Sequence, residues 1–244
     1  MNIKIFLLAG LLTVASAFSC SGSCPHPVVH TVAIFIDVTD PEHTATLSQH
    51  LQEELGSITK ALETLGAFNE CNQVKLSLYP INDLGENRGI HIISEVVLPQ
   101  MTPTQVVRRV RYPFRTQIQN GLNAFFTEHY RSEGYDRTRI YEPLCLLLNR
   151  PGRPNNIIVY SDLLEHGTVS LYDREQGYEP EPILKEMVQD CSCSLPDTLN
   201  HTSLHLLSFR SRKNDALVRR ARSFFTHIFK QRRATVVTGT GFQH

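Results

Sequence analysis

The sequence lacks three features that would assign it to a specialised class of protein. Its 244 residues hold 24 Lys and Arg against 24 Asp and Glu, so it has no charge excess typical of a general polyanion binder. Its 6 cysteines are too sparse for a small disulfide-held scaffold. No apolar run reaches the roughly 20 residues that a membrane-spanning helix needs. What remains, 41% hydrophobic and 20% charged, indicates a globular chain that forms one larger domain.

The common catalytic signatures are missing as well. The chain has no Gly-x-Ser-x-Gly elbow, no Walker loop and no Gly-x-Gly-x-x-Gly motif. Asp37 ends an apolar run, as in the Asp-x-Asp-x-Thr loop of haloacid-dehalogenase phosphatases, but Thr39 stands where that loop needs its second Asp. This substitution removes the general acid of that chemistry. We therefore expect no catalytic residues and no enzyme, with a metal-assisted phosphohydrolase as the third interpretation.

The N-terminus has the pattern of an export signal. Lys4 precedes the apolar residues 5–14, and Ala15-Ser16-Ala17 is an Ala-x-Ala cleavage site, so residues 1–19 are predicted to be a signal peptide. Cys20 follows directly and resembles the lipidated cysteine of bacterial lipoproteins. We expect an exported protein of the cell envelope, anchored to a membrane through Cys20. There are two alternatives. The protein is secreted with a plain signal peptide, or the N-terminal segment is a buried helix.

Strand and helix patterns alternate along the rest of the chain. Strands are predicted at 28–36, 73–81, 90–98, 156–160, 203–209 and 235–238, and helices at 41–65, 102–109, 113–130, 140–148, 183–190 and 215–230. This alternation predicts an α/β fold with a doubly wound, mostly parallel sheet and helices on both faces. The short connection before residue 90 makes that strand an antiparallel edge strand. The domain covers 28–240, after a linker at 20–27.

Oxygen-bearing side chains follow the two most apolar strands. Asp37 and Thr39 come after the first, Asp162 comes after the strand at 156–160, and Thr138 precedes a predicted helix. In open α/β sheets, ligands bind beyond the carboxyl ends of the strands. Two carboxylates and two hydroxyls are hard ligands that suit Mg²⁺ or Mn²⁺. The sequence therefore predicts a metal site of Asp37, Thr39, Thr138 and Asp162.

On these residues the chain resembles the von Willebrand factor A domain, over roughly residues 28–240. The family motif is Asp-x-Ser-x-Ser after the first strand, a separate Thr and a later Asp, which Asp37, Thr39, Thr138 and Asp162 match in order. Pro41 replaces the second Ser, so Asp40 is either an extra metal ligand or the cap of the next helix. The resemblance implies a metal-ion-dependent adhesion site at which Mg²⁺ or Mn²⁺ accepts an acidic side chain of a protein partner.

An alternative function stays open. The same fold with a degenerate metal site would serve as a structural scaffold of an envelope complex.

The basic stretch and the cysteines suggest no further site. The basic stretch at 210–233 suits a solvated helix face, and we expect no nucleic-acid partner. With Cys145 in an apolar run and Cys20 lipidated, the four remaining cysteines allow three pairings. The loops expected to contact a partner are 37–44, 131–139 and 162–180.

Overall fold

The structure is a computed structural model that describes residues 23–42, 44–45, 59, 62–63, 66–83, 89–167, 169–171, 179–208 and 215–240. The predicted signal peptide at 1–19 and Cys20 lie outside these residues. Most of the helix predicted at 41–65 also lies outside them, and its described positions 41, 42, 44, 45, 59, 62 and 63 are helical. No helix in the described ranges is both long and apolar enough to cross a membrane.

A single six-stranded sheet organises the described chain. Its strands are β1 (Val28–Asp37), β2 (Asn72–Ile81), β3 (Ile90–Ile93), β4 (Asn156–Tyr160), β5 (Ser203–Ser208) and β6 (Thr235–Thr240), and their order is β3-β2-β1-β4-β5-β6. All neighbours pair in parallel except β2 and β3, which are antiparallel. The predicted doubly wound, mostly parallel sheet with one antiparallel edge strand is therefore confirmed.

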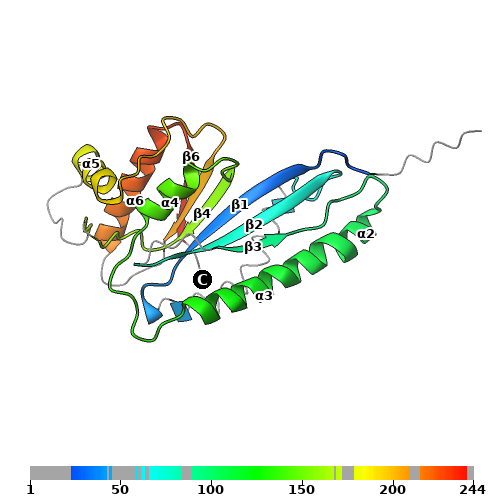
Figure 1. The fold of residues 1–244 in the computed structure, drawn as a ribbon, viewed down its shortest axis with the longest axis horizontal. Coiled ribbons are helices and arrows are strands. Elements are labelled where there is room, and N and C mark those ends of the chain that lie inside the picture. Colours follow the sequence, from blue (N-terminus) through cyan, green and yellow to red (C-terminus); the bar gives the residue numbers. More distant parts are fainter. Residues whose placement is uncertain are drawn as a thin grey trace, which may run out of the picture.

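Helices cover the two faces of this sheet (Figure 1). One face packs against α2 (Pro103–Val106), η1 (Val107–Arg111) and α3 (Tyr112–His129), and the other against α4 (Tyr141–Leu148), α5 (Pro180–Cys191) and α6 (Asp215–Lys230). Side chains of β1 alternate between the two cores, because Ile34 and Ile36 point to the α3 side and Phe35 to the α4 side. From Val32 onward, β1 is thus buried on both faces, as its continuous apolar run indicates.

The helix break predicted between residues 109 and 113 is wrong. The chain stays helical from Pro103 to His129, and the segment Val107–Arg111 is a π-helix whose bonds skip one extra residue, as in the bond from Tyr112 N–H to the Val107 carbonyl. Pro113 has no N–H and its ring would crowd the carbonyl four residues earlier in a regular α-helix. The wider π turn accommodates this proline without ending the helix.

Strand β3 is shorter than the predicted run of 90–98. It ends at Ile93 because the side chain of Ser94 turns back and accepts a hydrogen bond from Val74 N–H at 2.9 Å. The chain nevertheless stays beside β2, since Val97 N–H donates to the Asn72 carbonyl at 3.0 Å. Helix α5 is longer than predicted, because Pro180 and Pro182 fit its first turn, where N–H groups lack intrahelical partners.

Two disulfides and one free thiol account for the described cysteines. Cys24 pairs with Cys71, Cys191 pairs with Cys193, and Cys145 is free and buried. The first bond ties the segment before β1 to the turn before β2. The second joins residues only two positions apart at the end of α5. Cys145 is a core residue of the α4 side, as its apolar surroundings in the sequence predict.

Candidate functional site

The carboxyl ends of β1 and β4 meet at the point where the winding of the sheet changes direction. From β1 the chain continues to β2 and β3 on one side, and from β4 it continues to β5 and β6 on the other. Adjacent connections therefore leave the sheet in opposite directions and open a crevice beyond these two strand ends. Asp37 is the last residue of β1, and Ser161 and Asp162 directly follow β4.

Asp37 is the centre of a hydrogen-bond network at this edge. Its side chain is buried, with 7% exposure. One carboxylate oxygen, Oδ1, accepts bonds from the Thr39 backbone N–H at 3.0 Å and from the Thr39 hydroxyl at 2.5 Å. The other, Oδ2, accepts a bond from the Ser161 hydroxyl at 2.6 Å. These charge-assisted bonds compensate the burial of the carboxylate and join the ends of β1 and β4.

Thr138 joins this network from a loop that is distant in sequence. Its hydroxyl donates to the Thr39 hydroxyl oxygen at 3.1 Å, across 99 positions of the chain. Two backbone bonds hold it in place, from Thr138 N–H to the His166 carbonyl at 2.8 Å and from His166 N–H to the Thr138 carbonyl at 2.9 Å. The loop after β4 therefore positions Thr138 against the loop after β1.

Gly134 allows the approach of these loops. Its φ of +75° lies in the left-handed region, and a Cβ at this position would lie 2.9 Å from the Thr39 carbonyl oxygen. The next residue, Tyr135, donates its N–H to the same carbonyl at 3.1 Å, and its hydroxyl donates to the His129 carbonyl at 2.9 Å. The described parts of the three predicted contact loops thus meet at this edge of the sheet.

The other two predicted site residues make turn contacts. Asp40 Oδ1 accepts a bond from Glu42 N–H at 2.8 Å, which is the contact of a helix cap and agrees with the alternative role of Asp40. Asp162 Oδ1 accepts a bond from Leu164 N–H at 2.9 Å in the turn after β4. The hydroxyl just before it, Ser161, is the side chain that reaches Asp37 and also accepts a bond from Leu163 N–H at 2.9 Å.

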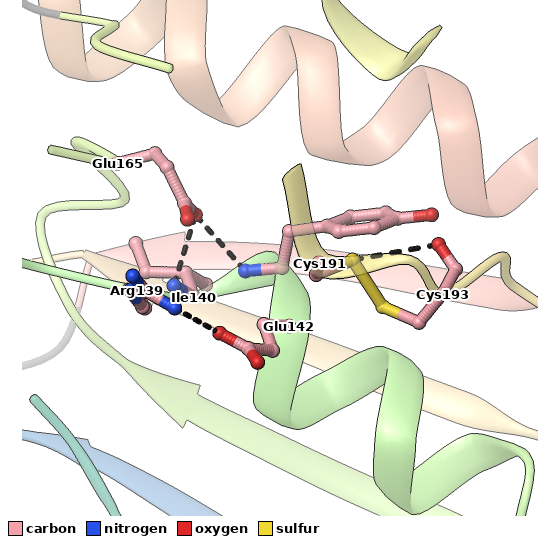
Figure 2. Close-up of polar contacts among 7 residues, drawn as sticks. Arg139, Ile140, Glu142, Glu165, Cys191 and Cys193 are labelled. Atoms are coloured by element: carbon pink, nitrogen blue, oxygen red, sulfur yellow. Dashed lines mark hydrogen bonds and ion pairs between the residues drawn. A yellow bond between two sulfur atoms is a disulfide. The ribbon is translucent and has the colours of Figure 1, made fainter. Parts of the chain in front are cut away.

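A buried carboxyl group beside the network caps helix α4. Figure 2 shows Glu165 pointing toward the start of the helix, where its Oε2 accepts bonds from the N–H groups of Ile140 and Tyr141, both at 2.9 Å. Burial raises the pKa of Glu165 to about 7, against the smaller opposing effect of these two bonds. The sequence did not predict this role for Glu165, because a cap supplied 25 positions away has no local signal.

A surface ion pair completes the surroundings of Glu165. Arg139 donates to the Glu142 carboxylate at 2.7 Å, and both side chains are partly exposed (Figure 2). The bond to Glu142 raises the pKa of Arg139, so this side chain stays charged at all physiological pH values. The nearby Cys191–Cys193 disulfide lies against the same side of α4. Of these groups, the Glu165 carboxyl holds the start of α4, which lies directly after the loop that carries Thr138.

The network has the chemistry of a site for a hard cation. It gathers one carboxylate and three hydroxyl oxygens, from Thr39, Thr138 and Ser161, and Mg²⁺ is commonly held by one or two carboxylates together with water. The Thr39 hydroxyl donates its proton to Asp37, and its oxygen accepts one bond from Thr138. One lone pair of this oxygen is left to coordinate a cation. Within the described ranges, no group of three or more His, Cys, Asp or Glu side chains has metal-site geometry, so hydroxyl ligands would be essential.

Comparison with known proteins finds likenesses among solved structures. No protein-family model matches the sequence, and no curated protein matches it. Among solved structures, the chain is similar to the human COPII-coat protein Sec24c, with a TM-score of 0.37 and 13% sequence identity. The match covers 89% of this chain and 30% of that chain, so this chain spans less than a third of the length of its neighbour. A likeness at this level supports no inference about function.

Proposed function

We propose that the carboxyl edge of the sheet is a divalent-cation-dependent protein-binding site of an exported adhesion or assembly module. The observation that carries this proposal is the convergence of Asp37, Thr39 and Thr138 at the switch point between β1 and β4. The hydroxyl oxygens of Thr39 and Thr138 come from loops 99 positions apart, yet lie within hydrogen-bond distance of each other. Because three loops must come together to form this arrangement, it is not the product of a single local turn.

In this proposal, Thr39 and Thr138 hold the cation directly, and Asp37 holds the Thr39 hydroxyl, to which Thr138 donates, in place. Asp37 supplies the negative charge that offsets part of the cation charge, and Ser161 fixes the second oxygen of its carboxylate. Asp162 lies in the adjacent turn and is the further carboxylate of the predicted set. When bound, Mg²⁺ or Mn²⁺ would supply an open coordination position for an acidic side chain of the partner protein.

One observation favours a second function, a scaffold with the same fold and no metal. Each hydroxyl proton of the network already has an acceptor, because Thr138 donates to Thr39, and both Thr39 and Ser161 donate to Asp37. Pro41 also stands where a further hydroxyl ligand is expected. In this alternative, the network only holds the loops together. The domain would be part of an envelope complex, either anchored through a lipid at Cys20 or secreted.

Thermal unfolding with and without cation separates these two functions. The purified protein would be unfolded in EDTA and in millimolar Mg²⁺ or Mn²⁺, beside Thr39→Val and Thr138→Val, which keep side-chain shape but lose the hydroxyl oxygen. A cation that binds only the folded state at about 100 times its Kd adds about 2.7 kcal/mol to the free energy of unfolding. Thr127→Val, on the exposed side of α3, is the matched control.

The proposed site requires a cation-dependent rise in the unfolding temperature of the wild type and of Thr127→Val. That rise should be lost in Thr39→Val and Thr138→Val. If Mg²⁺ and Mn²⁺ leave the unfolding temperature of the wild type unchanged, the cation-dependent function is wrong and the scaffold replaces it. A rise that both Thr variants retain would place the cation elsewhere on the protein.

A further inference from the structure

A second site lies toward the amino ends of the strands, away from the Asp37 network. It is a pocket of about 200 Å³ on the α4 side of the sheet. The floor comes from the first half of β1, from β2 and from β3, and the rim comes from the turn 150–154 between α4 and β4. Asp37 ends β1, whereas Thr31 in the pocket lies six positions earlier, so the two sites are separate.

Strand register brings polar side chains together on the floor of the pocket. Thr31 of β1 is opposite Lys75 of β2, and Ser77 of β2 is opposite His91 of β3. Residues two apart on a strand share a face, so Lys75 and Ser77 point to the same side. The Ser77 hydroxyl and His91 Nδ1 are 2.8 Å apart, which fixes the imidazole ring on this face. A stripe of hydrogen-bonding groups therefore crosses three strands.

The charges around the pocket are all of one sign. Lys75, Arg150 and Arg153 line it, and none of the described residues that line it is acidic. In the part of the chain that the structure describes, neither Lys75 nor Arg150 forms an ion pair through its side chain. Arg153 is held at the rim by a bond from Nη2 to the Thr198 carbonyl at 3.2 Å. Three permanent cations thus surround one small pocket without a carboxylate of the protein to balance them.

His91 responds to this concentration of positive charge. Burial lowers the pKa of its imidazole, and the charges of Lys75 and Arg150 lower it further. At neutral pH the ring is therefore neutral and can donate or accept a hydrogen bond. An anion bound among the same cations would offset their effect and raise the pKa of His91.

The rest of the pocket wall is apolar. Tyr79 packs its ring on Phe35 with centroids 5.1 Å apart and meets His91 edge-on at 6.1 Å. Ala33 and Leu147, which belong to the core on the α4 side, add aliphatic surface. A pocket with apolar walls and a few convergent polar groups is typical of small-molecule sites. At about 200 Å³, it is smaller than the usual pocket for a drug-sized ligand.

We propose that this pocket binds a small phosphate monoester, with the phosphate among Lys75, Arg150 and Arg153 and the organic group against Tyr79. A phosphate monoester carries a charge of about −1.5 to −2 at neutral pH, which matches three cations better than a single carboxylate does. The guanidinium groups of Arg150 and Arg153 can each bind two phosphate oxygens. The hydroxyl of Ser77 and the ring of His91 add neutral hydrogen bonds. This site is independent of the cation site proposed above.

Calorimetric titration with defined probes tests the proposal. Phenyl phosphate is the main probe, inorganic phosphate lacks the organic group, and benzoate has a carboxylate in place of the phosphate. Phenyl phosphate is expected to bind more tightly than either. Arg150→Gln and Lys75→Gln should each weaken its binding by about tenfold or more, because each removes a charge-assisted contact. Arg109→Gln, an exposed arginine of η1 on the opposite side of the sheet, should bind like the wild type.

A second readout and a second source of phosphate complete the test. Phenyl phosphate should raise the pKa of His91 measured by NMR, with the resonance identified by its loss in His91→Gln. Phosphatidylcholine vesicles with and without phosphatidic acid show whether the phosphate comes from a lipid headgroup, and the same two variants should reduce vesicle binding if it does. No binding of phenyl phosphate or of phosphatidic acid vesicles would overturn the proposal, as would binding that Arg150→Gln and Lys75→Gln leave unchanged.

Discussion

The buried Glu165 makes a specific prediction about how stability depends on pH. Its pKa is about 7 in the folded protein, against 4.5 for an ordinary glutamate. The folded state therefore holds the proton of this group more tightly than the unfolded state. Below about pH 4.5 both states are protonated and the group imposes no cost on folding. As the pH rises toward 7, the unfolded state gains from ionisation first, so the free energy of unfolding falls.

The size of this effect follows from the gap between 4.5 and about 7. At 1.36 kcal/mol per pKa unit, this gap corresponds to roughly 3 kcal/mol of stability lost between mildly acidic and mildly alkaline pH. Glu165→Gln removes the ionisation but keeps a side-chain oxygen that can accept from the N–H groups of Ile140 and Tyr141. We therefore expect the variant to be more stable than the wild type at about pH 8, and the difference to disappear as the pH falls to about 4.

Urea unfolding followed by circular dichroism, at a series of pH values, measures this difference. Other groups also titrate in this range, so the informative quantity is the free energy of unfolding of Glu165→Gln minus that of the wild type. Glu128→Gln, on the exposed side of α3, serves as the matched control and should follow the wild type at every pH. If the difference between Glu165→Gln and the wild type is the same at every pH, the argument from burial is wrong.

Three further predictions concern the stability of the loops and the disulfides. Gly134→Ala should lower the free energy of unfolding by about 1–3 kcal/mol, because alanine is strained at a positive φ and its Cβ would meet the Thr39 carbonyl; an unchanged urea midpoint would contradict this. Ser161→Ala should cost about 1–3 kcal/mol through the lost bond to the buried Asp37, while Ser132→Ala at an exposed loop should cost almost nothing in the same assay. Replacing Cys24 and Cys71 by Ser should lower the free energy of unfolding by up to about 4 kcal/mol, because that disulfide closes a loop across 47 positions. The same change at Cys191 and Cys193, which are two positions apart, should lower it by less than about 2 kcal/mol. Equal losses of stability in thermal unfolding would contradict the loop-length argument.

Much of the fold could be predicted because it depends on local patterns. The β-branched apolar runs at 28–36 and 156–160 correspond to the buried strands β1 and β4, and the apolar face of 215–230 corresponds to α6. The predicted break before Pro113 failed because proline excludes only the regular α-helical bond, and a π turn removes that conflict. Sequence patterns indicate where a helix is disfavoured, but tertiary packing decides whether it ends.

The candidate site was predictable only in part, for a related reason. The positions of Asp37 at the end of β1 and of Thr39 just after it follow from the strand itself, and in the structure both belong to one hydrogen-bond network with Thr138. Which of Ser161 and Asp162 faces Asp37 depends on the turn after β4, and adjacent residues leave a strand in opposite directions. No local pattern could identify the side chain that reaches across.

Glu165 and the cationic pocket illustrate the same limit at larger separation. Glu165 caps a helix that begins 24 positions earlier in the chain, and Arg150 shares a pocket with Lys75 only because β4 lies beside β1 and β2 lies on its other side. Neither pairing has a sequence spacing that would reveal it. Both become visible when the order of the strands is known.

The most direct test of the cation site is the binding of Mn²⁺ measured by electron paramagnetic resonance, in which free Mn²⁺ gives the signal and bound Mn²⁺ does not. Titration of Mn²⁺ into the wild-type protein should remove signal equivalent to one bound ion per chain. Excess Mg²⁺ should restore that signal, and Thr39→Val and Thr138→Val should fail to remove it. If the wild type leaves the free Mn²⁺ signal unchanged, the network around Asp37 does not bind a divalent cation.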